Sequence, residues 1–223
     1  MRERFDILAR IGVEGHLFPK DLLPSARSVV AFFVPINRQI ARENGKGGRP
    51  TRSWAVAYVR TNDVINRLSQ ALGRWFEERG LHFGLTPATH NFSEDRLMAQ
   101  WSHRHIAHLV NLGRFGFNHM LITPVGCVGR LGSLVTDADL GEHPIIHTDD
   151  ACLVKAGKRC SACVDACPVQ ALTVNGFDRR RCWERLKENR NTLAEFADLP
   201  PRTHVCGKCV VNLPCSFCNP MES

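Results

Sequence analysis

The sequence predicts an α+β protein with two parts: an α/β sandwich over residues 1–147 and a small cysteine-rich domain over residues 148–223. Three observations support this division. Segments typical of strands and helices alternate through the first part, a polar and turn-forming stretch lies near residues 137–150, and nine of the ten cysteines follow Ala151. A chain of 223 residues is long enough for one domain of ordinary size and a small one.

The first elements are predicted from apolar periodicity and from glycine. Residues 28–35 are rich in Val and Phe and end in proline, which indicates a buried strand. Several glycines and a proline in residues 38–52 predict a flexible basic loop. Apolar residues at three- and four-residue steps then predict a helix from Asn62, an N-cap, to Gly80, a C-terminal stop.

The remaining elements of the first part are shorter. We expect a strand over residues 81–85 and a second helix from about residue 93 to Gly113. Strands over residues 119–123 and 131–136 follow, joined by a glycine-bearing turn. Strands and helices in this order favour an α+β or α/β sandwich. In the cysteine-rich domain, a short helix is expected over about residues 183–196.

The cysteines of the last third follow the spacing of a domain with two iron–sulfur clusters. Two C-x2-C pairs are present, and a Cys-Pro dipeptide occupies residues 167–168. The cysteine before the proline ligates the other cluster in two-cluster ferredoxins, so we assign four thiolates to each [4Fe–4S] cluster. The first set is Cys152, Cys160, Cys163 and Cys215, and the second set is Cys167, Cys182, Cys206 and Cys209.

Two other interpretations of the cysteines stay open. The C-x2-C pairs at residues 160–163 and 206–209 could form one structural zinc site, although this leaves the other cysteines unexplained. A disulfide framework is the second alternative, although C-x2-C pairs close poor disulfide loops. Cys127 and Cys218 are left over, and Cys218 is an alternative to Cys215 as a cluster ligand.

The net charge of +7 bears on location and partners. Basic runs at residues 49–52 and 179–181 indicate solvated surface charge or a docking face for an acidic electron donor such as ferredoxin or flavodoxin. No RNA-binding module is visible, so we do not expect nucleic acid as a partner. No apolar run approaches the roughly 18–20 residues of a membrane helix, and the N-terminus has no signal core. We therefore expect a cytoplasmic protein without membrane contact, and a homodimer is compatible with the sequence.

The stretch over residues 111–119 is the candidate cofactor site of the first part. Gly113 and Gly116 would allow close backbone approach of a flat or bulky ligand, with Asn118 beside them. A helix stop is the structural alternative for the first glycine. Nearby, His105 and His108 lie on one helical face, where they could bind a metal or a corrinoid cobalt, donate a proton or simply form buried hydrogen bonds.

Several blocks of the chain resemble the epoxyqueuosine reductase family. They lie at residues 27–30, 54–58, 112–118, 129–136 and 177–182, and the resemblance covers roughly residues 25–215. It implies a nitroreductase-like N-terminal domain that seats cobalamin, followed by a ferredoxin-like domain with two clusters. The implied chemistry is electron transfer through the clusters to cobalt and reduction of a modified tRNA base.

The resemblance also points to candidate proton donors. Family reductases carry an acid, a proline and a Glu-Arg pair ahead of the glycine block, and the acid donates a proton. In this chain, ungapped matching places Leu97, Gln100, His103 and Arg104 at the positions of this motif ahead of the glycine block. The candidates in this chain are therefore Asp95, His103 and His105.

Three hypotheses of function follow. The first is an iron–sulfur redox protein whose two [4Fe–4S] clusters transfer electrons to cobalamin, a similar corrinoid or, as second choice, a flavin in the N-terminal domain. The second is a corrinoid-dependent reductase, an oxidoreductase related to epoxyqueuosine reductase. The third is a non-catalytic, ferredoxin-like electron-transfer partner.

Overall fold

The computed structural model describes residues 15–87, 92–141 and 150–222, which form two compact units. The first unit lies within Met1–Val34, Asp63–Leu112 and Leu131–Thr148, and the second within Pro35–Asn62, Gly113–Arg130 and Asp149–Ser223. The predicted boundary between residues 147 and 148 falls outside the described residues. The second unit thus takes in two segments from the first 130 residues in addition to the cysteine-rich part. Within the described residues, no helix is long and apolar enough to cross a membrane.

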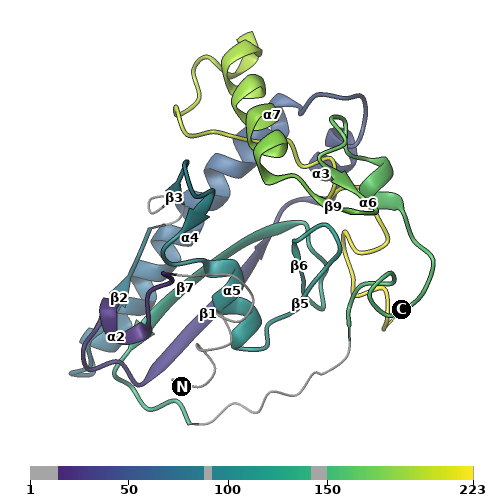
Figure 1. Cartoon of the computed structure of the whole chain (residues 1–223). Helices are drawn as coiled ribbons and strands as arrows, with labels where there is room; N and C mark the ends of the chain where they lie inside the picture. Colours follow the sequence, from purple (N-terminus) through teal and green to yellow (C-terminus); the bar gives the residue numbers. More distant parts are fainter. Residues whose placement is uncertain (1–14, 88–91, 142–149, 223) are drawn as a thin grey trace. The chain divides into compact units, whose positions relative to one another are not determined.

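The first unit is built on a three-stranded sheet in the order β1-β7-β2, with β1 (Ser28–Pro35), β7 (Gly129–Thr136) and β2 (Phe83–Leu85) (Figure 1). Strand β2 pairs antiparallel with β7, and Phe83 lies opposite Thr136. The N–H of Arg27, just before β1, donates to the Thr136 carbonyl at 2.9 Å. The three strands of this sheet were all predicted, and β1 has the predicted bounds.

Both faces of this sheet carry apolar side chains that helices cover. On one face, Leu134 is fully buried with Phe76 of α4 (Arg52–Glu77), whose residues from Asp63 onward belong to this unit. On the other face, Val135 packs with Trp101 and with Ile106 of α5 (His103–Leu109). Consecutive residues of a strand point to opposite faces, so β7 contributes to both cores. The α+β class is confirmed at this level.

Two short elements complete the first unit, and one corrects a prediction. Helix α2 (Pro19–Leu22) precedes β1, and β3 (Phe92–Ser93) pairs antiparallel with β4 (Met98–Ala99). The predicted helix from about residue 93 is wrong over its first ten residues, because these form the β3–β4 hairpin. Leu97 in its turn has a φ of +50°, a left-handed conformation that a helix does not contain.

A second correction concerns residues 38–52, which contain a helix and not only a loop. Helix α3 (Arg38–Asn44) begins at Asn37, whose side chain accepts hydrogen bonds from the N–H groups of Gln39 and Ile40 at 2.8 and 3.4 Å. Helix α4 also begins ten residues earlier than predicted. The Thr51 hydroxyl accepts from the Trp54 N–H at 3.3 Å, and the Trp54 side chain is buried.

The second unit contains short elements around a core that includes cysteines. Besides α3 and the first eleven residues of α4, its elements are β5 (Arg114–Phe115), β6 (Leu121–Ile122), α6 (Ala162–Asp165), β8 (Leu172–Thr173), β9 (Gly176–Phe177), α7 (Arg179–Thr192) and η1 (Ala194–Phe196). Strands β5 and β6 form one antiparallel hairpin, and β8 and β9 form another. The core gathers Trp54, Phe196 and Val211 around the buried Cys127 and Cys152.

Candidate functional site

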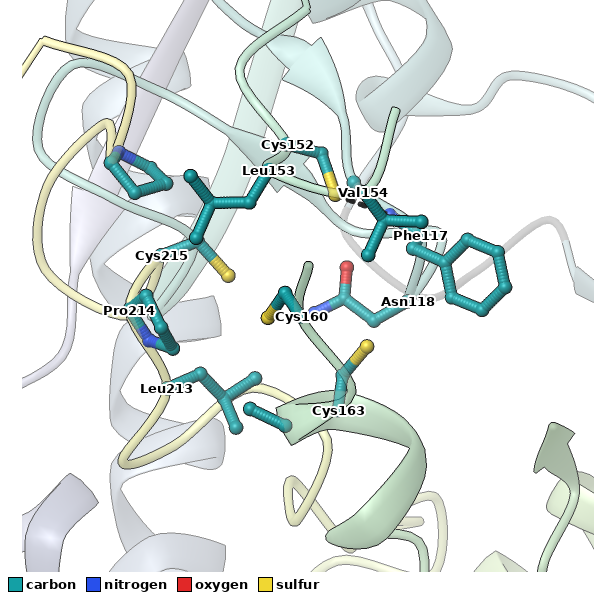
Figure 2. A pocket seen from close by; sticks show the side chains of 13 residues that line it. Phe117, Asn118, Cys152, Leu153, Val154, Cys160, Cys163, Leu213, Pro214 and Cys215 are labelled. Carbon is teal, nitrogen blue, oxygen red and sulfur yellow. Dashed lines mark hydrogen bonds between the residues drawn. The ribbon is translucent and has the colours of Figure 1, made fainter. Parts of the chain in front are cut away.

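Four of the predicted cluster cysteines line one cavity of the second unit. Cys152, Cys160, Cys163 and Cys215, here named the first cysteine group, surround about 350 Å³ of space that is partly open to solvent. Figure 2 shows their sulfur atoms pointing into this space. Side chains 63 residues apart in sequence thus converge on a single centre, which is the arrangement that four thiolate ligands require.

Local structure places the first three of these thiols. Cys160 precedes α6, and Cys163 lies within it, so the C-x2-C spacing follows the first turn of this short helix. The Ser161 hydroxyl donates to the Asp165 carboxylate at 2.6 Å across the same turn. The backbone N–H of Phe117 donates to the Cys152 sulfur at 3.4 Å, and hydrogen bonds of this kind stabilise a thiolate ligand.

Cys215 is held by backbone pairing with the turn after β6. Its carbonyl accepts from the Cys127 N–H at 2.9 Å. In that turn Gly126 has a φ of +88°, and a Cβ there would lie 2.4 Å from the Ser216 carbonyl oxygen, so glycine is required. Cys218 does not line the cavity, and its thiol donates to the Pro214 carbonyl at 3.4 Å.

Cys127 has a partner that the sequence did not suggest. Its buried thiol donates to the Cys215 sulfur, with the two sulfurs 4.0 Å apart. This hydrogen bond lowers the pKa of Cys215 and is the first cause that raises the pKa of Cys127, ahead of burial. Cys127 therefore stabilises Cys215 as the thiolate, the form that binds metal.

The other four predicted ligands, here named the second cysteine group, influence one another's ionisation. They are Cys167, Cys182, Cys206 and Cys209. Burial raises the pKa of Cys182 to about 11, and Cys206 and Cys167 raise it further. Burial also raises the pKa of Cys209, followed by the other three thiols of the group and by Cys163. Four thiols that disfavour one another's ionisation need a bound cation before all can ionise.

The structure groups the cysteines differently from the single zinc site considered as an alternative. That site would combine residues 160–163 with residues 206–209, whereas the structure assigns these pairs to different groups. In the described part of the chain, no three His, Cys, Asp or Glu side chains are placed to hold one metal ion. A cluster differs from a single ion because each thiolate binds its own iron, so the sulfurs lie farther apart than around one zinc. Four thiols line the first cavity, and four thiolates are the donor set that one cluster binds.

The predicted cofactor residues lie beside the first cysteine group. Gly116 and Asn118 line the cavity, together with Phe117, whereas Gly113 does not. A Cβ on Gly113 would lie 2.4 Å from the Ile122 carbonyl oxygen, and one on Gly116 would lie 2.7 Å from the Asn118 side chain. Contacts within the chain therefore account for both glycines, and their role in binding a corrinoid stays a prediction.

Asn118 connects the surroundings of the two cysteine groups. Its side chain is only 5 % exposed, and its Nδ2 donates to the Cys209 carbonyl at 2.7 Å. Its Oδ1 accepts from the Met120 N–H at 3.1 Å, which holds the amide in one orientation. Asn118 thus lines the first cavity and fixes the backbone of a cysteine in the second group.

The three candidate proton donors all belong to the first unit. Asp95 is exposed in the turn between β3 and β4. His103 Nδ1 lies 2.7 Å from the Ser133 hydroxyl, which also accepts from the Trp101 indole N–H at 3.0 Å. Burial, followed by Arg104 and two other histidines, lowers the pKa of His105 to about 3. A histidine that is neutral near pH 7 is a weak acid, so His105 does not suit the role of proton donor.

Comparison with solved structures identifies proteins of the same fold. Epoxyqueuosine reductases from Bacillus subtilis and Streptococcus thermophilus superpose with a TM-score of 0.50, at 18 % and 17 % sequence identity and over 83 % and 81 % of this chain. The chain shares its fold with epoxyqueuosine reductases. The resemblance seen in the sequence blocks is thereby confirmed at the level of fold.

The shared fold covers part of the reductases. The chain spans about half the length of those it matches, 48 % in each case. Another matching structure, also at 18 % identity, is an epoxyqueuosine reductase with an epoxyqueuosine-modified tRNA stem loop. No family model matches the chain, and no curated protein matches it.

Sequence reasoning missed Lys208, which lies inside the second C-x2-C pair. Its side chain is only 4 % exposed, and its ammonium donates to the carbonyls of Asn44 and Lys46. A lysine beside a cysteine is ordinarily a solvated residue, so nothing in the local pattern marks it as buried. Its partners lie more than 160 residues away in the sequence.

Proposed function

We propose that the chain is an iron–sulfur redox protein with two [4Fe–4S] clusters, one on each cysteine group. The observation that carries this proposal is the convergence of Cys152, Cys160, Cys163 and Cys215 on one cavity. When bound, such clusters take up and release single electrons. The arrangement would be a nitroreductase-like domain combined with a ferredoxin-like domain, which the shared fold supports.

The protein supplies the surroundings of the sulfur ligands. Hydrogen bonds from the Phe117 N–H to Cys152 and from the Cys127 thiol to Cys215 stabilise negative charge on the first cysteine group. The other residues lining that cavity are apolar or neutral, which limits the access of water. These contacts hold the ligands in place before a cluster binds.

The electron acceptor is proposed only as a class, a corrinoid such as cobalamin or a similar cofactor. Contacts within the chain account for the glycines at residues 113 and 116, so we assign the cofactor no residues and derive no step through it. The alternative of a corrinoid-dependent reductase rests on the shared fold. In the remaining alternative, the chain is a ferredoxin-like partner that passes electrons to another protein.

The electron donor is proposed to be an acidic carrier such as ferredoxin or flavodoxin. Arg179, Arg180 and Arg181 are exposed in the first turn of α7, directly before Cys182, and form no ion pair within the described part of the chain. Farther along α7, Lys187 pairs with Glu184 at 2.9 Å. Cations at a helix N-terminus oppose the helix dipole, so an acidic partner would relieve an unfavourable arrangement.

Metal analysis after anaerobic purification tests the clusters. We expect about eight irons per chain and broad visible absorbance, because two clusters hold four irons each. About one zinc per chain without colour would refute the proposal and favour the zinc alternative.

A matched pair of variants tests the ligand assignment. Cys215→Ser is expected to lose about half of the iron, because it removes a ligand of one of two clusters. Cys218→Ser is expected to keep all of it, because Cys218 does not line the cavity. Iron loss in Cys218→Ser alone would show that the ligands were assigned wrongly.

Anaerobic titration with cob(II)alamin, and separately with flavin, distinguishes the three hypotheses for the electron acceptor: a corrinoid, a flavin or another protein. Binding of cob(II)alamin with a change in its spectrum supports a corrinoid acceptor, and binding of flavin alone supports the second choice. If neither binds to iron-loaded protein, the chain is better explained as a ferredoxin-like partner.

A further inference from the structure

The ammonium group of Lys208 is buried within the loop that carries the second cysteine group. Lys208 lies between Cys206 and Cys209, and its Nζ donates to the Asn44 carbonyl and, at 2.8 Å, to the Lys46 carbonyl. Asn44 is the last residue of α3, where the helix dipole favours positive charge. The ammonium thus has two fixed acceptors.

Further contacts hold the same loop against α3 and α4. The fully buried Asn44 side chain donates to the Cys206 carbonyl and accepts from the Thr51 N–H, both at 2.9 Å. Gly207 has a φ of +77°, and a Cβ there would lie 2.5 Å from the Trp54 indole. The backbone on both sides of Lys208 is therefore closely fixed.

The positive charge of Lys208 is not neutralised by a carboxylate. Its acceptors are two backbone carbonyls, and it forms no ion pair among the described residues. Burial raises the pKa of Cys206, whereas the Lys208 backbone N–H, then the Lys208 ammonium and then the Arg185 guanidinium oppose this. The charge therefore lies in the loop that carries two cysteines of the second group, Cys206 and Cys209.

Among the described residues, no charged side chain lines the cavity of the first cysteine group. Apart from its cysteines, its cavity is lined by glycine, alanine, leucine, valine, proline and phenylalanine residues and by the neutral amide of Asn118. The two groups share a ligand type and differ in the charge beside them. Net charge around a cluster is one of the factors that set its reduction potential.

We infer that Lys208 makes the site at Cys167, Cys182, Cys206 and Cys209 the more easily reduced of the two. This inference rests on the proposed clusters. Reduction adds one electron and no proton to the site, with the electron supplied by a one-electron carrier protein. The added negative charge is stabilised by a buried ammonium, which solvent screens little. An electron that enters the chain would then reside mainly at the second cysteine group.

The test is a potentiometric titration followed by electron paramagnetic resonance. Wild-type protein is expected to show two midpoint potentials. Lys208→Gln removes the charge and keeps a donor for the two carbonyls, and Lys208→Met removes both. Both variants are expected to lower the higher of the two midpoint potentials and to leave the lower midpoint potential unchanged. Lys158→Met, at an exposed position, is the matched control for loss of one charge and is expected to leave both unchanged.

Iron content is measured first, so that failures are distinguishable. Wild-type protein without iron would refute the proposed clusters themselves. Iron-loaded variants whose higher potential equals that of wild type, or whose lower potential shifts instead, would overturn the role of Lys208. If Lys208→Met binds less iron than wild type, the midpoint potentials of Lys208→Gln decide the test. If Lys208→Gln also fails to load, Lys208 is needed for the loop and its role in the potential is refuted.

Discussion

Mild acid should destabilise the first unit, because two of its histidines are held neutral. His16 is 9 % exposed, its Nδ1 donates to the Leu17 carbonyl at 2.7 Å and its Nε2 accepts from the Ser102 N–H at 2.9 Å. Protonation of Nε2 would break the bond at Ser102, the N-cap of α5. Burial lowers the pKa of His16, and burial with nearby charges lowers that of His105 to about 3.

The direction of this pH effect follows from comparing the pKa of each histidine in the folded chain with its pKa in the unfolded chain. An unfolded histidine has a pKa of about 6.5, so below that pH the unfolded chain binds a proton that folded His105 does not. Its stabilising contribution is complete above pH 6.5 and is lost as the pH falls toward 3. For His105 the loss reaches at most about 1.4 kcal/mol per pH unit, or about 1 kcal/mol between pH 6 and 5.

Two measurements check this expectation. In an NMR titration, the His105 ring signals should not shift between pH 8 and 5, and a midpoint near 6.5 would refute the reasoning. In urea unfolding at pH 7, 6 and 5, His105→Gln should lose less stability on acidification than wild type, by about 1 kcal/mol per pH unit. Equal iron content of the two proteins is the control, because cluster loss would also destabilise the chain.

Two further predictions concern the second unit. Gly126→Ala should cost about 1–3 kcal/mol and lower the iron content, because alanine is strained at a φ of +88° and its Cβ would displace Ser216 next to Cys215. Gly47→Ala, at a φ of +61° with open space around it, is the control that should keep its iron; equal iron in both would contradict the expectation. Arg180→Glu should slow reduction by an acidic ferredoxin at low salt several-fold and weaken its salt dependence, measured by stopped-flow absorbance. An unchanged rate would place the donor elsewhere.

The sequence predicted the elements and groupings that depend on local spacing. Strand β1 is encoded by a continuous apolar run ended by proline. The division of eight cysteines followed from C-x2-C spacing and Cys167-Pro168, and in the structure the four cysteines of the first set line one cavity. Whether these thiols bind clusters stays a prediction.

Features that depend on long-range contacts could not be predicted in the same way. Helix α3 is hidden by the glycines that follow it, and its last residue is fixed by Cys206, 162 residues away. The β3–β4 hairpin was not predicted, because the spacing of its apolar residues also fits one face of a helix. Only the structure shows the left-handed conformation of Leu97 in its turn. Lys208 needed the fold itself, since its acceptors are the carbonyls of Asn44, the last residue of α3, and of Lys46.

The cysteine groups belong to the core of the second unit. Cys127 and Cys152 are buried with Trp54 and Phe196, and Cys215 packs against the same core. Burial raises the pKa of Cys163 and the pKa of Cys182 to about 11, so these two thiols are neutral near pH 7 without bound metal. Ligation would replace their protons with iron–sulfur bonds inside the core, so cluster binding and packing would contribute to one folding free energy. Variants that disturb core packing near Trp54 should then lose iron, and variants that lose iron should unfold at lower urea.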